Sequence, residues 1–177
     1  MSLLSLLFDP RGAIDRRAFW SGLIQLTIVS LAVVVGLTVV DMDVAWAALP
    51  AVGEAWVLSD VAGHLRHAAP PDVPLIAGVF LVAARLYATA CLMLKRARDA
   101  GKRPHALIVL GLASLLVHVL VGFWVYDLFP EGMAIIAPLA ADAMVTAVLG
   151  LVFTTWLGAL RSSPASGPAR SWRLSPG

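Results

Sequence analysis

The sequence predicts an all-α integral membrane protein, a four-helix bundle with its N- and C-termini in the cytoplasm. Two observations predict this fold: long apolar stretches, and basic residues that gather in alternate connections between them. Hydrophobic residues make up 60% of the 177 positions, and charged residues make up only 14%. A soluble domain is typically about 45–50% apolar. Because the excess is too large for one globular core, lipid is the expected solvent for much of the chain.

Four stretches are long enough to cross a hydrocarbon core of about 30 Å, which takes about 20 apolar residues. The first carries no charge, and the second carries only Arg85. We expect the connection between them, residues 41–72, to form a short helix at the membrane surface, with Trp46 and Trp56 at headgroup level. The predicted organisation is one membrane domain over residues 1–160, with spans at about 18–40, 73–94, 106–126 and 133–160, and a flexible cytoplasmic tail over 161–177.

Charge predicts the orientation of these spans, because basic residues of short loops stay in the cytoplasm. Eleven of the 13 Lys and Arg residues fall on one side, in the N-terminal segment, the connection after the second span and the tail. The opposite side holds Arg66 and seven of the 11 Asp and Glu residues. Both signals alternate across four spans. They predict a multi-pass membrane protein.

A cleaved signal peptide is the alternative for the first span. Arg16-Arg17 is similar to a twin-arginine signal, and residues 45–47, Ala-Trp-Ala, are similar to a cleavage site. A signal core has about 7–15 apolar residues. The stretch here is longer and three further spans follow it, so we favour a membrane span.

Three ionisable residues lie at membrane depth: Arg85, His118 and Asp142. A charge at mid-bilayer costs about 2.5–3.5 kcal/mol on insertion scales. Arg85 therefore needs a partner, water or a route to the surface, and Asp142 is the only opposite charge within a predicted span. Polar and small residues follow each of the three at helical spacing, so we expect their faces to meet. A structural tie between helices is the simpler interpretation, and a proton or ion relay or a solute pocket is the functional alternative.

Two motifs flank the first two spans. Residues 8–20 read F-D-P-R-G-A-I-D-R-R-A-F-W, and residues 95–105 read K-R-A-R-D-A-G-K-R-P-H. They resemble the motifs F-x-G-R-x-S-R-x-x-F-W and R-R-L-H-D-x-G-x-S-G-W of the YhaH-like inner-membrane proteins, small bacterial proteins grouped as domain of unknown function 805. The matching positions are Gly12, Arg16, Phe19 and Trp20 in the first motif, and Arg96, Asp99 and Gly101 in the second.

The chain departs from the family pattern at several positions. Ala13 and Asp15 replace an arginine and a serine of the first motif, and Ala97-Arg98 replaces a Leu-His pair of the second. These departures are typical of a divergent member. The resemblance implies an inner-membrane protein, and it implies no activity, cofactor or catalytic residue.

The two motifs are expected to pack together on the cytoplasmic side. Gly101 suits the position after a helix end, where left-handed backbone is needed. Phe19 and Trp20 are placed to anchor the first span at the interface. The excess of cations there has two interpretations: it sets topology, or it binds anionic lipid headgroups, each Lys or Arg contributing about 1 kcal/mol. The residues for such contacts are Arg16, Arg17, Arg96 and Arg98.

The residues exclude several function classes. No Cys/His spacing indicates a metal site, no glycine-rich phosphate loop is present, and the lone Cys91 has no partner for a disulfide. We expect His64 and His67 to be solvated loop residues. We therefore predict no enzymatic activity, no cofactor and no nucleic-acid partner.

The favoured function is a scaffold, assembly or envelope-maintenance role, with anionic membrane lipids and a homo-oligomer or other membrane proteins as partners. The alternative is a small transporter or channel subunit built on Arg85, His118 and Asp142.

Overall fold

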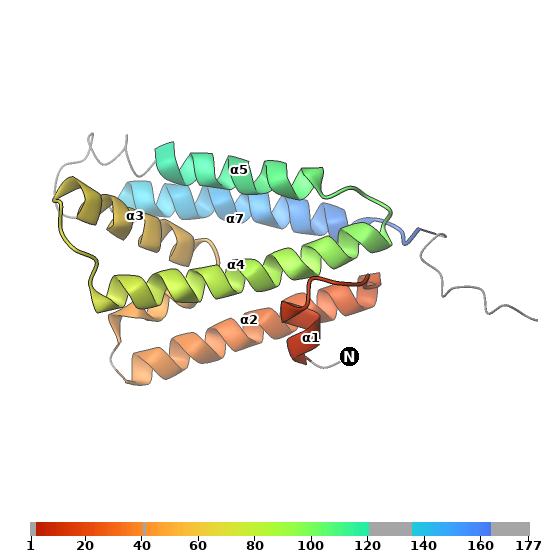
Figure 1. The fold of residues 1–177 in the computed structure, drawn as a ribbon, viewed down its shortest axis with the longest axis horizontal. Coiled ribbons are helices and arrows are strands. Elements are labelled where there is room, and N and C mark those ends of the chain that lie inside the picture. Colours follow the sequence, from red (N-terminus) through yellow and green to blue (C-terminus); the bar gives the residue numbers. More distant parts are fainter. Residues whose placement is uncertain (1–2, 41, 121–135, 164–177) are drawn as a thin grey trace, which may run out of the picture.

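The structure, a computed structural model, describes residues 3–40, 42–120 and 136–163. Within these ranges every regular element is a helix, which confirms the predicted all-α class there (Figure 1). The elements in chain order are α1 (Leu3–Phe8), α2 (Arg16–Val39), the 3₁₀ helix η1 (Asp43–Ala48), α3 (Val52–Arg66), α4 (Val73–Asp99), α5 (His105–Leu120) and α7 (Ile136–Ala159).

Three helices in the described ranges are long and apolar enough to cross a membrane: α2, α4 and the part of α7 from Pro138 to Ala159. Only 11% of the most apolar window of α2, and the same share of α7, is buried inside the protein. Such apolar and exposed helices are suited to contact with lipid. These findings support a membrane protein.

The third predicted span coincides with α5, an apolar helix of 16 residues over its described length. Residues 121–126 of that span, and residues 133–135 of the fourth, lie outside the described part of the chain. The number of four membrane passages therefore stays a prediction.

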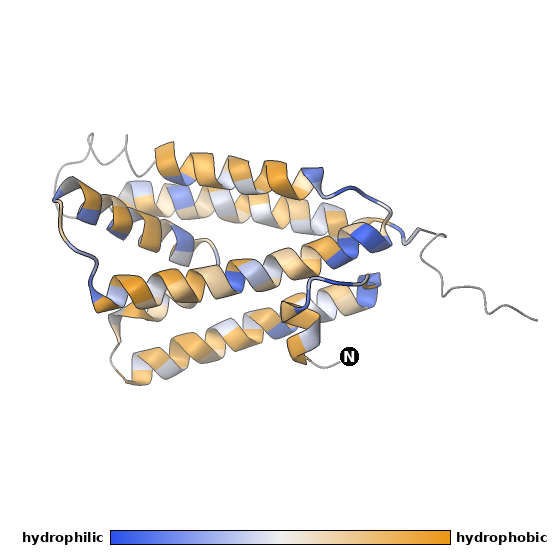
Figure 2. Cartoon of the chain, in the orientation of Figure 1, coloured by the Kyte–Doolittle hydropathy of each residue, from blue (hydrophilic) through white to orange (hydrophobic). Residues whose placement is uncertain are grey.

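The long helices α2, α4, α5 and α7 run along the longest axis of the molecule (Figure 1). Helix α4 packs against α2, and α5 packs against α7. Hydrophobic residues cover most of their length, whereas hydrophilic residues gather where α4 ends and α2 begins (Figure 2). We call this the basic end; it comprises residues 9–17, 95–103 and 161–163.

Two apolar clusters fill the interior. One lies toward the basic end and joins α1, α2, α4 and α7 through buried side chains that include Phe19, Leu92 and Leu157. The other lies toward the opposite end and joins η1, α3 and α4 through Val57, Leu75 and other side chains. The polar contacts described below lie beside these clusters.

Helix α4 continues beyond the predicted second span to Asp99, through the basic segment, and so ends just before Gly101 as expected. At its first turn Asp72 accepts a hydrogen bond from the Leu75 backbone N–H at 2.8 Å, which satisfies one of the free donors of the helix start. Arg96 and Arg98 lie in its last turn, where cations complement the helix dipole. Gly101 follows with φ of +66°, as its predicted place after the helix end requires.

The connection over residues 41–72 differs from the prediction of a helix at the membrane surface. Helix α3 packs against α4, α5 and α7, and its Ala55, Val57 and Ala62 are buried. Trp56 packs near Gly78 against the apolar cluster that contains Val57 and Leu75, whereas Trp46 is exposed. The surface prediction failed because the apolar face of α3 finds protein partners and is drawn into the bundle.

Candidate functional site

The first polar contact of the interior joins α3 to α4. Arg85 Nη2 lies 2.7 Å from Glu54 Oε2, and the two side chains are 8% and 13% exposed. Glu54 occupies the first turn of α3, and Arg85 lies near the middle of α4. Helix α3 thus carries a carboxylate from the connection over residues 41–72 to the one cation of the second predicted span.

The second polar contact joins α5 to α7. Asp142 Oδ2 accepts a hydrogen bond from His118 Nδ1 at 2.8 Å, and both side chains are buried. Thr146, one turn further along α7, donates its hydroxyl to the backbone carbonyl of Asp142. The two helices that carry the pair also pack on each other, so the contact lies within an existing interface.

The three residues predicted to form one polar cluster are therefore divided between two pairs. Arg85 does not pair with Asp142; it pairs with Glu54, and Asp142 pairs with His118. The expectation was wrong because Glu54 lies outside every predicted span, so its approach to Arg85 depends on the fold of residues 41–72. The signal that could have found it is an acid in the first turn of a short apolar segment that follows Pro50.

Several buried polar atoms at this depth have no hydrogen-bond partner. They are Arg85 Nε and Nη2, Glu54 Oε2 and Asp142 Oδ1. The Glu54–Arg85 contact is close, but its geometry does not form a hydrogen bond from Nε or Nη2 of Arg85. At 1.5 Å per helical residue, Arg85 lies about 21 Å from the end of α4 and Asp142 about 26 Å from the end of α7. The two pairs therefore lie at similar depth.

At the basic end, Lys95 is fully buried and holds α1. Its Nζ donates hydrogen bonds to the carbonyls of Ser5 and Leu6 at 2.7 and 2.8 Å. These are carbonyls of a short helix that has no later turn to bond them. Tyr87, further back on α4, donates to the Phe8 carbonyl at 3.2 Å and stacks its ring on that of Phe8. Helix α1 is thus fixed to α4 through its middle and its C-terminal end.

Arg96 is also fully buried, and it joins α4 to the end of α7. Its guanidinium donates to the Asp99 carboxylate and to the Leu160 carbonyl. Asp99 Oδ2 also accepts the Ser162 hydroxyl at 2.6 Å, and the Asp99 carbonyl accepts the Ser163 N–H at 2.7 Å. Arg96 is therefore a structural residue, and its predicted contact with lipid headgroups is not possible in this arrangement.

Arg98 connects the second motif to the first. Its guanidinium donates to the carbonyls of Pro10 and Gly12, the latter at 3.3 Å. The Ile14 N–H donates to the Lys95 carbonyl at 3.4 Å. Gly12 has φ of +83°, a backbone conformation that glycine adopts without strain. The structure thus brings the two motifs into direct contact, through side chains of the second and backbone carbonyls of the first.

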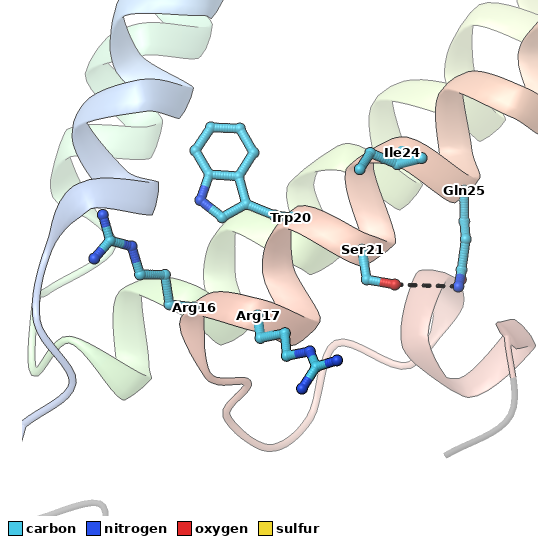
Figure 3. A pocket seen from close by; sticks show the side chains of 6 residues that line it. All are labelled: Arg16, Arg17, Trp20, Ser21, Ile24 and Gln25. Atoms are coloured by element: carbon cyan, nitrogen blue, oxygen red, sulfur yellow. Dashed lines mark hydrogen bonds between the residues drawn. The ribbon is translucent and has the colours of Figure 1, made fainter.

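Arg16 and Arg17, in contrast, lie exposed at the start of α2 (Figure 3). Neither guanidinium forms an ion pair or hydrogen bond with a described residue. Both line an open groove of about 660 Å³, whose further lining residues are Trp20, Ser21, Ile24 and Gln25. Asp15 caps the helix beside them by accepting the Ala18 N–H at 2.7 Å.

Trp20 forms one wall of this groove and packs closely on α7. A Cβ atom added to Gly158 would lie 2.5 Å from Trp20 Cζ2, so only a glycine permits this approach. Phe19, its neighbour, is completely buried and meets the Trp20 ring edge to face at 5.7 Å between centroids. The prediction of both aromatics as interface anchors is thus refined: Phe19 anchors α2 to the interior, and Trp20 is the aromatic that remains 37% exposed.

Among the described residues, no three His, Cys, Asp or Glu side chains come close enough together to hold a metal ion. His64 lies 3.4 Å from Asp60 one turn back on α3, at a partly exposed position. Cys91 is buried in the interior.

The fold and these contacts define a helical membrane protein whose polar interior residues join helices. No family model, curated protein or solved structure matches the chain.

Proposed function

We propose that this chain is a four-span protein of the bacterial inner membrane, a divergent relative of the YhaH-like proteins, with its basic end in the cytoplasm. Its role is that of a non-enzymatic scaffold in membrane assembly or envelope maintenance. Three long apolar helices with exposed apolar surfaces support membrane insertion. The concentration of Lys and Arg at one end supports the orientation.

One observation carries the proposal: some cations of the basic end bind protein groups and fix helices, whereas Arg16 and Arg17 are exposed at the start of α2. Lys95, Arg96 and Arg98 bind protein carbonyls and carboxylates, and they hold α1, the first motif and the end of α7 on α4. Arg16 and Arg17 have no such partner among the described residues. A rigid end with free cations is suited to holding a membrane surface rather than to chemistry.

Anionic phospholipid is the first proposed partner, because the inner leaflet attracts cations that lie near it. The second is a further copy of this chain or another membrane protein. Apolar side chains such as Ile24, Val35 and Leu151 are exposed on α2 and α7. They are free to contact lipid or another apolar helix.

Two measurements test the proposal. Reporter fusions after Arg103 and within the connection over residues 41–72 are expected to report cytoplasm and periplasm, respectively. Crosslinking in native membranes is expected to capture a defined oligomer or partner. The orientation fails if the Arg103 fusion reports periplasm. The scaffold role fails if the chain crosslinks to nothing and its deletion leaves the envelope unchanged.

A transporter or channel subunit is the second candidate, and the buried polar atoms without partners favour it. Arg85 Nε and Asp142 Oδ1 lie unpaired at similar depth. Helix α3 packs against α4, α5 and α7 and brings the carboxylate of Glu54 to Arg85. A solute flux in proteoliposomes that disappears in Asp142→Asn but persists in Asp60→Asn would favour this candidate over the scaffold.

A further inference from the structure

We propose that the start of α2 is a binding site for one anionic phospholipid, with Arg16 and Arg17 on its phosphate and Trp20 and Ile24 along its acyl chain. The inference rests on the proposed function, because it requires the basic end to lie at the inner leaflet. It adds a defined position, a stoichiometry and a division of roles among the arginines.

The first argument is the arrangement of the groove. Its lining residues form two adjacent rows on α2, each with the four-residue spacing of one helix face. One row is Arg16, Trp20 and Ile24, and the other is Arg17, Ser21 and Gln25. Figure 3 shows Arg16 and Trp20 on the side of α7, and Arg17 extended in a different direction. Both rows start with a cation and continue toward the apolar part of the helix.

This order matches the chemistry of a phospholipid. The charged positions lie at the helix start, where the chain leaves the bilayer, and Ile24 lies two turns further in with 59% of its surface exposed. Arginine binds phosphate oxygens through two parallel N–H donors, which favours a phosphodiester over a diffuse negative surface. A headgroup at Arg16 and Arg17 therefore directs an acyl chain along Trp20 and Ile24.

The second argument is that no described residue binds the guanidinium groups of these two arginines, whereas the side chains of Lys95, Arg96 and Arg98 bind protein groups. Lys95 and Arg96 are fully buried, and Arg98 is bound to two carbonyls of the first motif. Asp15, the acid closest in sequence, is engaged with the Ala18 N–H. The guanidinium groups of Arg16 and Arg17 are thus exposed and available to an anionic ligand.

The third argument is that one wall is formed in advance. Trp20 is fixed between the edge of Phe19 and the surface of Gly158. A ligand that lies against a fixed ring loses less entropy than one that must order it. Ser21 and Gln25 are also joined, since the Gln25 amide donates to the Ser21 hydroxyl at 3.3 Å.

Native mass spectrometry of the delipidated full-length protein tests the site, with phosphatidylglycerol and phosphatidylcholine as probes. We expect one phosphatidylglycerol to bind the wild type in preference to phosphatidylcholine. Arg16→Gln/Arg17→Gln should weaken that binding about tenfold or more. The matched control is Lys102→Gln/Arg103→Gln, which removes the same charge from exposed positions at the same end. It should change the affinity less than twofold.

A further variant and a further ligand distinguish the possible outcomes. Arg16→Lys/Arg17→Lys keeps the charge and the orientation, and it should bind with intermediate affinity because it loses the paired donors. Equal weakening in the two Gln double variants would overturn the site, and so would equal binding of the two lipids by the wild type. Free glycerol phosphate that displaces the lipid completely would show a phosphate site without an acyl-chain part. Reporter fusions that place the basic end outside would refute the proposed function while leaving the detergent measurement intact.

Discussion

Glu54 Oε2 lies 2.7 Å from Arg85 Nη2, although the two residues belong to different helices and one of them comes from a connection between spans. This contact fixes α3 inside the bundle. It also places a carboxylate beside an arginine that cannot readily lose its charge. The two groups compensate each other where lipid and apolar side chains offer no other acceptor.

The first prediction concerns this pair. Glu54→Gln should lower the free energy of unfolding by about 3–5 kcal/mol, because it leaves Arg85 buried without a counter-charge. Glu54→Gln combined with Arg85→Met should recover much of the loss, because no buried charge remains. Unfolding of the purified protein in mixed micelles measures both. A single variant as stable as the wild type would show that Arg85 does not depend on Glu54.

The second prediction concerns His118 and Asp142. A double-mutant cycle with His118→Ala and Asp142→Ala should give a coupling of roughly 1 kcal/mol, the scale of polar contacts between membrane helices. A second cycle with Arg85→Ala and Asp142→Ala should give a coupling near zero, because these two residues belong to separate pairs. Strong coupling between Arg85 and Asp142 would contradict the pairing described here.

The third prediction concerns the approach of α2 to α7. Gly158→Ala should lower stability by about 1–3 kcal/mol, because its new Cβ would overlap the Trp20 ring. Gly150→Ala is the matched control on the same helix, since nothing lies within 4 Å of its Cβ position. This control should be neutral or more stable by up to about 1 kcal/mol, the helix preference of alanine over glycine. Equal effects of the two substitutions would refute the close packing of Trp20.

The fourth prediction concerns the buried cations of the basic end. Lys95→Met keeps the volume but removes the donors to the carbonyls of α1. It should release α1 and raise hydrogen exchange in residues 3–8 while α2 stays protected. Arg96→Gln should instead loosen residues 160–163, whose contacts depend on its guanidinium and on Asp99. Exchange that rises uniformly in both variants would mean that the basic end unfolds as one unit.

The sequence alone predicts much of this architecture. Spacing and hydropathy predict the helices over residues 18–40 and 73–94, because a bilayer requires a minimum apolar length. The positive φ of Gly101 also follows from local chemistry, because few other residues adopt it. Each of these features depends on residues that are neighbours in the chain.

Which polar groups meet was decided by the tertiary structure. Arg16 and Arg96 are the same residue type, one in each motif, yet Arg96 is completely buried and Arg16 is exposed. Arg96 reaches the Leu160 carbonyl at the end of α7, and the partner of Arg85 comes from α3. No local pattern encodes such contacts, because they arise only when distant segments pack and an uncompensated charge in the interior would be too costly. The chain therefore specifies locally which residues are charged or apolar, and the packing of the helices determines which charges face each other.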